Sequence, residues 1–241
     1  MQNTKNAIKA FNGNLETDST IWRGLQNPDI RIKVRQFLLK TMHGTQKIGS
    51  FWTHIPGYEE RQICQTCGTP ESMEHILTSC NESTVRIIWD MAKDLWPHTA
   101  HPWPEISLGM ILGCGSASIP PARNRDTHHQ RNSPRTIARL MRIIITESAH
   151  LIWSIRCERV IQERQHTEQE IKAKWLRAIN KRLTEDKIIA TRIKRDTHTK
   201  HLVRLTWEDV LRKQGDLPHR WLNNGEFLVG RRVSVLNRTG P

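Results

Sequence analysis

The sequence predicts a mainly α-helical protein, and three observations carry that prediction. Apolar residues recur at three- and four-residue intervals over long stretches. Signals for helix starts precede several of these stretches, and no stretch sustains the alternation of apolar and polar residues that marks a strand. The chain has 241 residues, of which 37% are hydrophobic, so it is long enough to bury a substantial core.

One clear helix is predicted in the N-terminal part of the chain. Residues 1–27 are polar and are expected to be weakly structured. The next helix is predicted over 28–42, because Pro28 and Asp29 suit its first turn and Gly44 suits its end. Its apolar residues share one face, and they are Ile30, Val34, Phe37, Leu38 and Met42.

The stretch 45–63 is predicted to be irregular and is followed by two shorter helices, at about 71–79 and 82–95. Phe51, Trp52 and Tyr58 are expected to pack into an apolar plug, with stacking on nucleic-acid bases as the alternative. The acids near these helix ends are expected to be helix-end or solvated carboxylates, and they are Asp29, Glu71 and Glu74.

Long helices dominate the second half, at about 134–165, 167–195 and 200–213. Ser148 is the small member of the inner face of the first. A capping box formed by Thr167 and Glu170 opens the second. Its inner face is predicted to contain Ile171, Trp175, Ala178, Ile179, Leu183, Ile189 and Ile193.

The charge divides unevenly along the chain. Residues 1–120 hold 11 basic and 11 acidic side chains, whereas 121–241 hold 26 and 13, so the whole formal charge of +13 lies in the second half. A neutral half followed by a basic half favours a polyanionic partner, and nucleic acid is the commonest. A solvated basic surface without a specific ligand is the alternative.

The sharpest motif is Cys64-x2-Cys67-x7-His75-x4-Cys80. Two cysteines three residues apart can hold one ion from a tight turn, and Gly68 can adopt the positive φ that such a turn often needs. Cys80 can return to the ion only if the helix containing His75 ends before it. Three thiolates and one imidazole form a closed tetrahedral set, which predicts structural Zn²⁺ and leaves no ligand position for catalysis. Buried thiols without an ion are the alternative.

These residues resemble a known family. Ile32-Lys33-Val34-Arg35-Gln36-Phe37, Lys47-Ile48-Gly49, Trp52 and the Cys64–Cys80 motif with Glu74-His75 are similar to the zinc-binding region of non-LTR, LINE-type retrotransposon reverse transcriptase polyproteins, fungal type. The resemblance covers about 28–115 and gives the ligand roles to Cys64, Cys67, His75 and Cys80. It implies reverse transcriptase and RNase H domains as polyprotein partners. The basic second half has a looser likeness to the C-terminal tail of such polyproteins.

No enzymatic activity is expected. The Tyr-x-Asp-Asp signature of the family's polymerase is absent from the sequence. Residues 1–27 hold only Glu16 and Asp18, too few carboxylates for the two-metal site of an RNase H. The predicted function is a zinc-stabilised nucleic-acid-binding segment. A structural or protein-interaction domain, or a decayed remnant without activity, is the alternative.

The predicted architecture is therefore a small zinc-knuckle helical module followed by a basic long-helix bundle. Its parts are a weakly structured segment (1–27), the zinc-binding domain (28–115), a linker or loop (116–134) and a basic helical region (135–241). With no membrane span or signal sequence expected, the chain is predicted to be intracellular. The predicted contacts to RNA or DNA phosphates are Lys33, Arg35, Lys40, Lys174, Lys181, Arg192 and Arg195.

Overall fold

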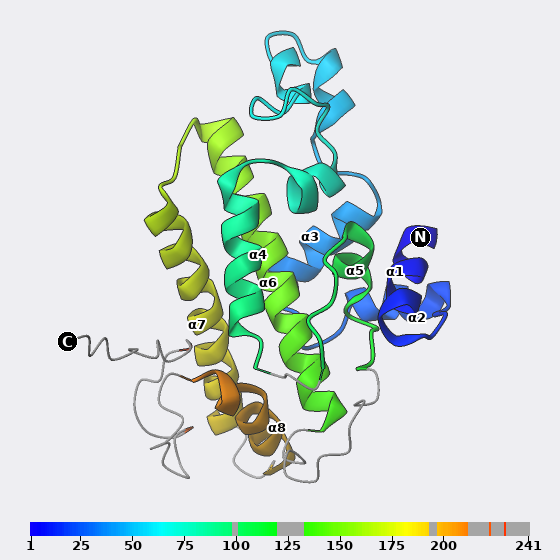
Figure 1. Cartoon of the computed structure of the whole chain (residues 1–241), viewed down its shortest axis with the longest axis vertical. Helices are drawn as coiled ribbons and strands as arrows, with labels where there is room; N and C mark the ends of the chain where they lie inside the picture. The colour runs from blue at the N-terminus through cyan, green and yellow to red at the C-terminus, as the bar shows by residue number, and fades with distance from the viewer. Residues whose placement is uncertain (98–100, 120–132, 193–196, 212–221, 223–228, 230–241) are drawn as a thin grey trace, which may run out of the picture.

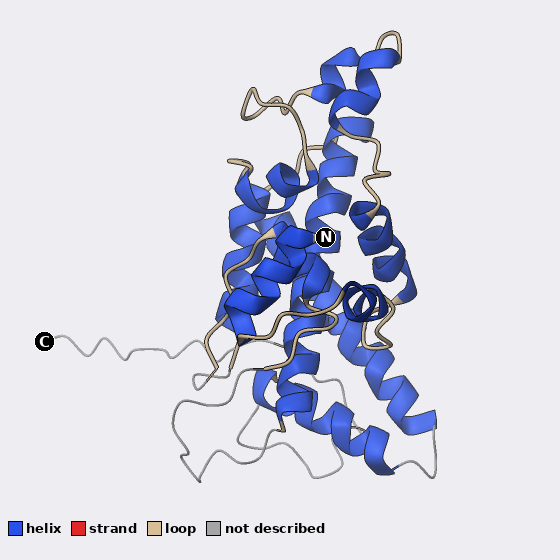
Figure 2. Ribbon diagram, turned by 90° about the vertical axis from the view of Figure 1, so that its right-hand side faces the viewer, coloured by secondary structure: helices blue, strands red, loops and turns tan. Residues whose placement is uncertain are grey.

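The computed structural model describes residues 1–97, 101–119, 133–192, 197–211, 222 and 229, and its centre is the long helix α6 (Pro134–Gln162) (Figure 1). Around it pack α3 (Ile32–Met42), α4 (Ser83–Leu95), α5 (Leu108–Gly113), α7 (Glu168–Arg192) and α8 (Thr197–Trp207). The predicted mainly α fold is confirmed. The described part contains no strand, only the isolated bridges Ile63–Pro70 and Leu211–Val229 (Figure 2).

Local sequence signals explain where the two longest helices begin. Ser133 caps α6 and Pro134 occupies its first turn, where the missing N–H costs no hydrogen bond. The predicted capping box of α7 is confirmed: the Glu170 N–H donates to Thr167 Oγ1 (3.2 Å), and the Thr167 N–H donates to Glu170 Oε2 (2.8 Å). The small Ser148 is buried where expected and accepts a hydrogen bond from Trp175 Nε1 (2.9 Å).

Residues 1–27 are not weakly structured, contrary to the prediction. They form α1 (Gln2–Asn12) and α2 (Asp18–Leu25), and α1 packs closely on α5. A Cβ at Gly109 would lie 2.6 Å from the Asn3 carbonyl oxygen, and one at Gly113 would lie 2.6 Å from the Ile8 side chain. Because α5 has no side chains at these two positions, α1 can approach closely and bury one of its faces. Local sequence signals do not reveal this long-range contact.

The predicted start of the third helix is also wrong. Pro28 and Asp29 form a turn, and α3 begins at Ile32. Asp29 does not interact with a helix N-terminus, because its carboxylate accepts from Arg139 Nε (3.0 Å) and Arg142 Nη1 (2.6 Å) of α6. Two buried guanidinium groups fix the turn that precedes α3.

Residues 45–63 form two 3-10 helices, η1 (Gly49–His54) and η2 (Glu59–Gln62), which project beyond the helical bundle at the top of Figure 1. Trp52 is buried as expected, with its Nε1 donating to the Lys47 carbonyl (2.9 Å). Phe51 and Tyr58 are exposed, so the predicted plug is wrong for both. A 3-10 helix turns about 120° per residue, so the consecutive Phe51 and Trp52 cannot both face inward.

The inner face of α7 differs from the prediction at its C-terminal end. Ile189 is exposed, whereas Arg182 and Asp186 are buried. Asp186 accepts from Arg182 (3.0 Å), from Arg139 of α6 (2.8 Å) and from Trp207 Nε1 of α8 (2.8 Å). Polar residues with matched partners therefore replace the expected apolar stripe.

One apolar cluster joins the elements predicted to belong to separate domains. It contains residues from Ile8 in α1 to Val229 near the C-terminus, and α4 of the predicted zinc domain contacts both α6 and α7. None of the described helices is long and apolar enough to cross a membrane. Most of the predicted linker (120–132), Ile193, Arg195 and nearly all of the chain after 211 lie outside the described residues.

Candidate metal centre and basic face

A small hairpin supplies two of the four candidate ligands. The Cys64 N–H donates to the Thr69 carbonyl (2.8 Å), and the Gly68 N–H donates back to the Cys64 carbonyl (2.8 Å). Gly68 has a φ of +66°, which confirms the predicted need for glycine at this turn. The turn brings Cys64 and Cys67 to the same side of the hairpin.

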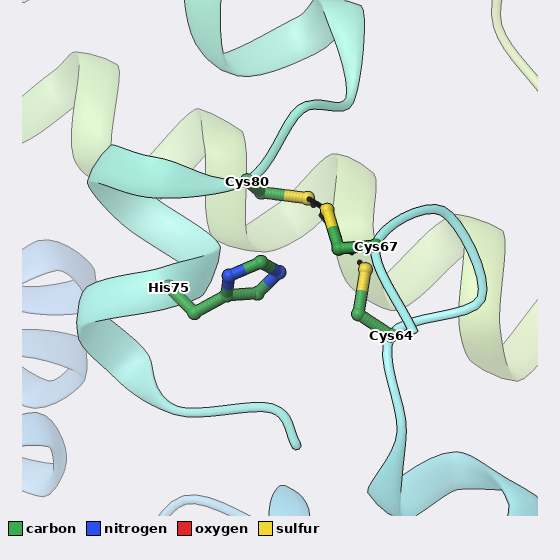
Figure 3. Close-up of side chains that lie close together, drawn as sticks. All are labelled: Cys64, Cys67, His75 and Cys80. Carbon is green, nitrogen blue, oxygen red and sulfur yellow. Dashed lines mark hydrogen bonds between the residues drawn. The ribbon is translucent and has the colours of Figure 1, made fainter. Parts of the chain in front are cut away.

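A π-helical turn, η3 (His75–Ser79), supplies the other two. The Cys80 N–H donates to the His75 carbonyl five residues earlier (2.8 Å), and Cys80 itself is extended. The helix therefore ends before Cys80, as the motif requires. The wider π turn and the extended backbone bring this thiol back beside the His75 ring (Figure 3).

The four side chains converge from two elements. Their ligand atoms all lie within 4.8 Å of one another. Cys80 Sγ is 3.6 Å from Cys64 Sγ and 3.7 Å from Cys67 Sγ (Figure 3). A tetrahedral ion with Zn–S bonds of about 2.3 Å holds two sulfurs about 3.8 Å apart. His75 Nε2 is buried without a hydrogen-bond partner. The cluster is thus compatible with a zinc ion.

The thiols of the cluster differ in how readily they ionise. Burial raises the pKa of Cys80 to about 12. Burial also opposes ionisation of Cys64, but the adjacent His75 ring and the backbone groups of Cys67 and Thr66 lower its pKa to about 7. The Asn81 N–H donates to Cys67 Sγ (3.3 Å), a bond that favours the thiolate. A divalent ion would supply the charge needed to hold three thiolates together.

Glu71 anchors the hairpin to the bundle, a role that the sequence did not reveal. Its buried carboxylate pairs with Arg156 of α6, with Oε1 3.1 Å from Arg156 Nε. Its carbonyl oxygen would lie 2.5 Å from a Cβ at Gly49, whose φ is +51°. The prediction of a solvated carboxylate is therefore wrong for Glu71, whereas Glu74 is exposed as expected.

The predicted phosphate contacts of α3 differ in their exposure. Lys33 and Lys40 are exposed. Arg35 is partly buried and donates through Nη1 to the Gln26 carbonyl (3.2 Å), while its buried Nε has no partner. Arg35 therefore contributes to the packing between α2 and α3.

On α7 the predicted contacts also separate into two kinds. Lys181 and Arg192 are exposed. Lys174 forms an ion pair with Glu158 of α6 (2.7 Å), to which His166 also bonds (2.6 Å). Burial opposes ionisation of Glu158, but these two partners outweigh it and lower its pKa. Lys174 is thus engaged within the protein.

Arg177 is an exposed cation that the sequence prediction omitted. At about 100° per residue, Arg177, Lys181 and Arg192 fall within about 60° of one another around α7 and extend along about 22 Å of its length. We call these three residues the basic stripe. Helical spacing from Lys181 could have identified Arg177, which stands four residues before it.

Other arginines of the basic half are not available at the surface. Arg139, Arg142, Arg156 and Arg182 are buried, and each pairs with a carboxylate. Three of those pairings join α6 to the N-terminal half, through Asp29 and Glu71. Part of the positive charge therefore stabilises the fold.

Comparisons with protein-family models, with curated proteins and with solved structures each found no match to this chain.

Proposed function

We propose that this chain is a zinc-stabilised nucleic-acid-binding module, in which the Cys3His cluster has a structural role and α7 contacts phosphates. The basic stripe is the observation that carries the proposal. Lysine and arginine side chains aligned on one exposed helix face can neutralise successive phosphates and release their counterions. Lys33 and Lys40 on α3 are the secondary candidates for contact.

The bound ion would be Zn²⁺, held by Cys64, Cys67, His75 and Cys80. It would supply charge to stabilise three thiolates and would join the hairpin to η3. Four protein ligands complete a tetrahedral site, so no position remains for an activated water. The role assigned to the metal is therefore stabilisation of the fold.

We also propose that the chain derives from a LINE-type retrotransposon polyprotein, with reverse transcriptase and RNase H domains as its partners in that context. The ligand spacing and the sequence before it support this origin. Gly49 is one of the residues that carry the resemblance, and it has a structural role here because a side chain would collide with the Glu71 carbonyl.

A binding titration with RNA and with duplex DNA at several salt concentrations tests the function. Replacing Arg177, Lys181 and Arg192 by glutamine should weaken binding to all sequences and flatten the slope of log affinity against log salt by about two to three. The matched control replaces Lys9, Arg23 and Lys93, which are exposed on other helices. An equal loss in the control would indicate an effect of net charge alone, and unchanged binding in the stripe variant would refute the role of α7.

One observation favours docking of an acidic protein as a second candidate function. Ile188 lies between Lys181 and Arg192 on the same face of α7 and is 44% exposed, and the adjacent Ile189 is 48% exposed. Apolar side chains beside cations suit a protein surface better than a phosphate backbone. Replacing both isoleucines by serine should leave nucleic-acid affinity unchanged under the first proposal. It should abolish binding to an acidic protein under the second.

A further inference from the structure

We propose that the projecting segment formed by η1 and η2 is a stacking platform for single-stranded nucleic acid. This inference rests on the proposed nucleic-acid-binding function and specifies the form of the polymer. The starting observation is the exposure of two rings: Phe51 is 40% exposed and Tyr58 is 46% exposed. Every other Phe, Tyr or Trp in the described part of the chain is buried or partly buried.

Each exposed ring has a cation beside it. Lys47 Nζ lies 5.5 Å from the centroid of Phe51, and Arg61 Cζ lies 4.4 Å from that of Tyr58. Bases stack on aromatic rings and on guanidinium planes, while the same cations can meet the flanking phosphates. This combination of groups is the one that proteins use to bind single strands without a sequence requirement.

The rings are held in place by contacts beneath them. Trp52 packs edge-on against Phe51 with their centroids 5.2 Å apart, and it lies 6.1 Å from Tyr58. Arg61 also lies over the Trp52 ring, at 5.2 Å. The buried Trp52 thus orders both exposed rings before a ligand arrives, which lowers the conformational entropy lost on binding.

The charge of the segment favours a stacked single strand over a duplex or an acidic peptide. Glu59 and Glu60 are exposed in η2 and balance Lys47 and Arg61. Binding driven by phosphate attraction alone would gain little here, since the formal charge of these four residues sums to zero. Stacking does not require net charge, and it needs bases that are not already paired.

Arg61 connects the platform to a polar cavity of about 340 Å³ beside the zinc-ligand hairpin. The cavity walls include Thr66, Ser83 and Arg159 together with the carboxylates of Glu60, Glu71 and Glu82, and Arg159 Nη1 donates to Thr66 Oγ1 (3.3 Å). The platform and the hairpin form one continuous surface.

The test compares labelled oligothymidylate with a blunt duplex of equal length, using the full zinc-loaded chain. The variant replaces Phe51 and Tyr58 by leucine, which keeps apolar bulk and removes the rings. Loss of one stacked base should lower affinity for the single strand about tenfold, and loss of both about a hundredfold. The salt slope and the affinity for the duplex should not change.

The matched control replaces Leu15 and Ile161, exposed apolar residues outside the segment, by alanine, and should bind both polymers as the wild type does. Circular dichroism and zinc content verify that each variant is folded. Unchanged binding of the single strand by the leucine variant, or an equal loss on the duplex, overturns the platform while the role of α7 stands. A wild-type chain that binds neither polymer overturns the proposed function itself.

Discussion

The helical bundle around α6 and the segment that holds the four candidate ligands are stabilised by different means. The bundle buries a continuous apolar cluster and closes it with ion pairs such as Arg139–Asp186. Between residues 49 and 72 the buried side chains are few, and the segment includes the projecting η1 and η2. A short segment without its own core needs another source of stability, and a metal ion is a common one.

The contrast also assigns different roles to the polar groups of the two regions. In the bundle, buried arginines pair with buried carboxylates, so removing one partner of a pair should destabilise the protein. In the ligand segment, three thiols and an imidazole converge without a counter-charge. We therefore expect the bundle to fold without the ion, and the hairpin and η3 to depend on it.

Zinc removal should produce the largest change. Chelation should abolish hydrogen-exchange protection between residues 59 and 80, because apparent binding energies of structural zinc reach about 10 kcal/mol or more. Helix α4 should stay protected with α6 and α7, since it contacts both. Simultaneous loss of protection in α6 and α7 would show one cooperative unit and contradict the division.

Breaking the anchor between the two regions should cost about 3–5 kcal/mol. Arg156→Met leaves the buried Glu71 carboxylate without its partner. Denaturant unfolding measures the loss, and the double variant Glu71→Leu, Arg156→Met should recover most of it because no charge remains buried. A single variant as stable as the wild type would show that the hairpin is not held through Glu71.

Acid should weaken the bundle through His150 of α6. Burial, with Lys33 and Arg31 nearby, lowers the pKa of His150 from 6.5 to about 4. Between these pH values the unfolded chain binds a proton that the folded chain does not, so stability falls as pH decreases from 6.5 to 4, by up to about 3 kcal/mol. Above pH 6.5 the residue contributes no pH dependence.

The His150→Leu variant isolates this effect. Its free energy of unfolding should depend less on pH between 4 and 6.5 than that of the wild type. Loss of metal in acid is common to both proteins and cancels in the difference. The exposed His54 is the matched control, and His54→Leu should retain the wild-type slope. Parallel pH profiles for wild type and His150→Leu would contradict the assignment.

The smallest expected effect is a difference in stability between alanine variants at two glycines with positive φ. Gly49 and Gly57 have φ of +51° and +82°, but a Cβ at Gly57 meets nothing within 4 Å. Both alanine variants should lose about 1 kcal/mol to backbone strain. Gly49→Ala should lose about 2 kcal/mol more, since its Cβ collides with the Glu71 carbonyl. Equal losses in thermal unfolding would show that the contact is not tight.

Features encoded over short sequence distances could be predicted. The spacing of Cys64, Cys67, His75 and Cys80 identified a cluster that the fold brings together, and Gly68 has the expected positive φ. The capping box at Thr167 could also be predicted, because capping depends on neighbours within a few residues.

Features that depend on distant partners could not be predicted. Asp29 bonds to arginines more than 100 residues away, and Glu71 bonds to one 85 residues away. A carboxylate near a helix end looks the same in sequence whether it is solvated or buried against a guanidinium. The helices within 1–27 were missed for a similar reason, since α1 is stabilised by the close approach of Gly109 and Gly113.

The zinc content of the purified, reduced protein shows directly whether the Cys3His cluster holds one zinc ion. Native mass spectrometry should find one zinc per chain in the wild type and none in Cys80→Ser. Cys157→Ser is the matched control, since Cys157 lies on α6 outside the cluster, and it should retain the ion. Folded, reduced wild-type protein without bound zinc, or equal zinc content in Cys80→Ser, would show that these four residues are not a zinc site.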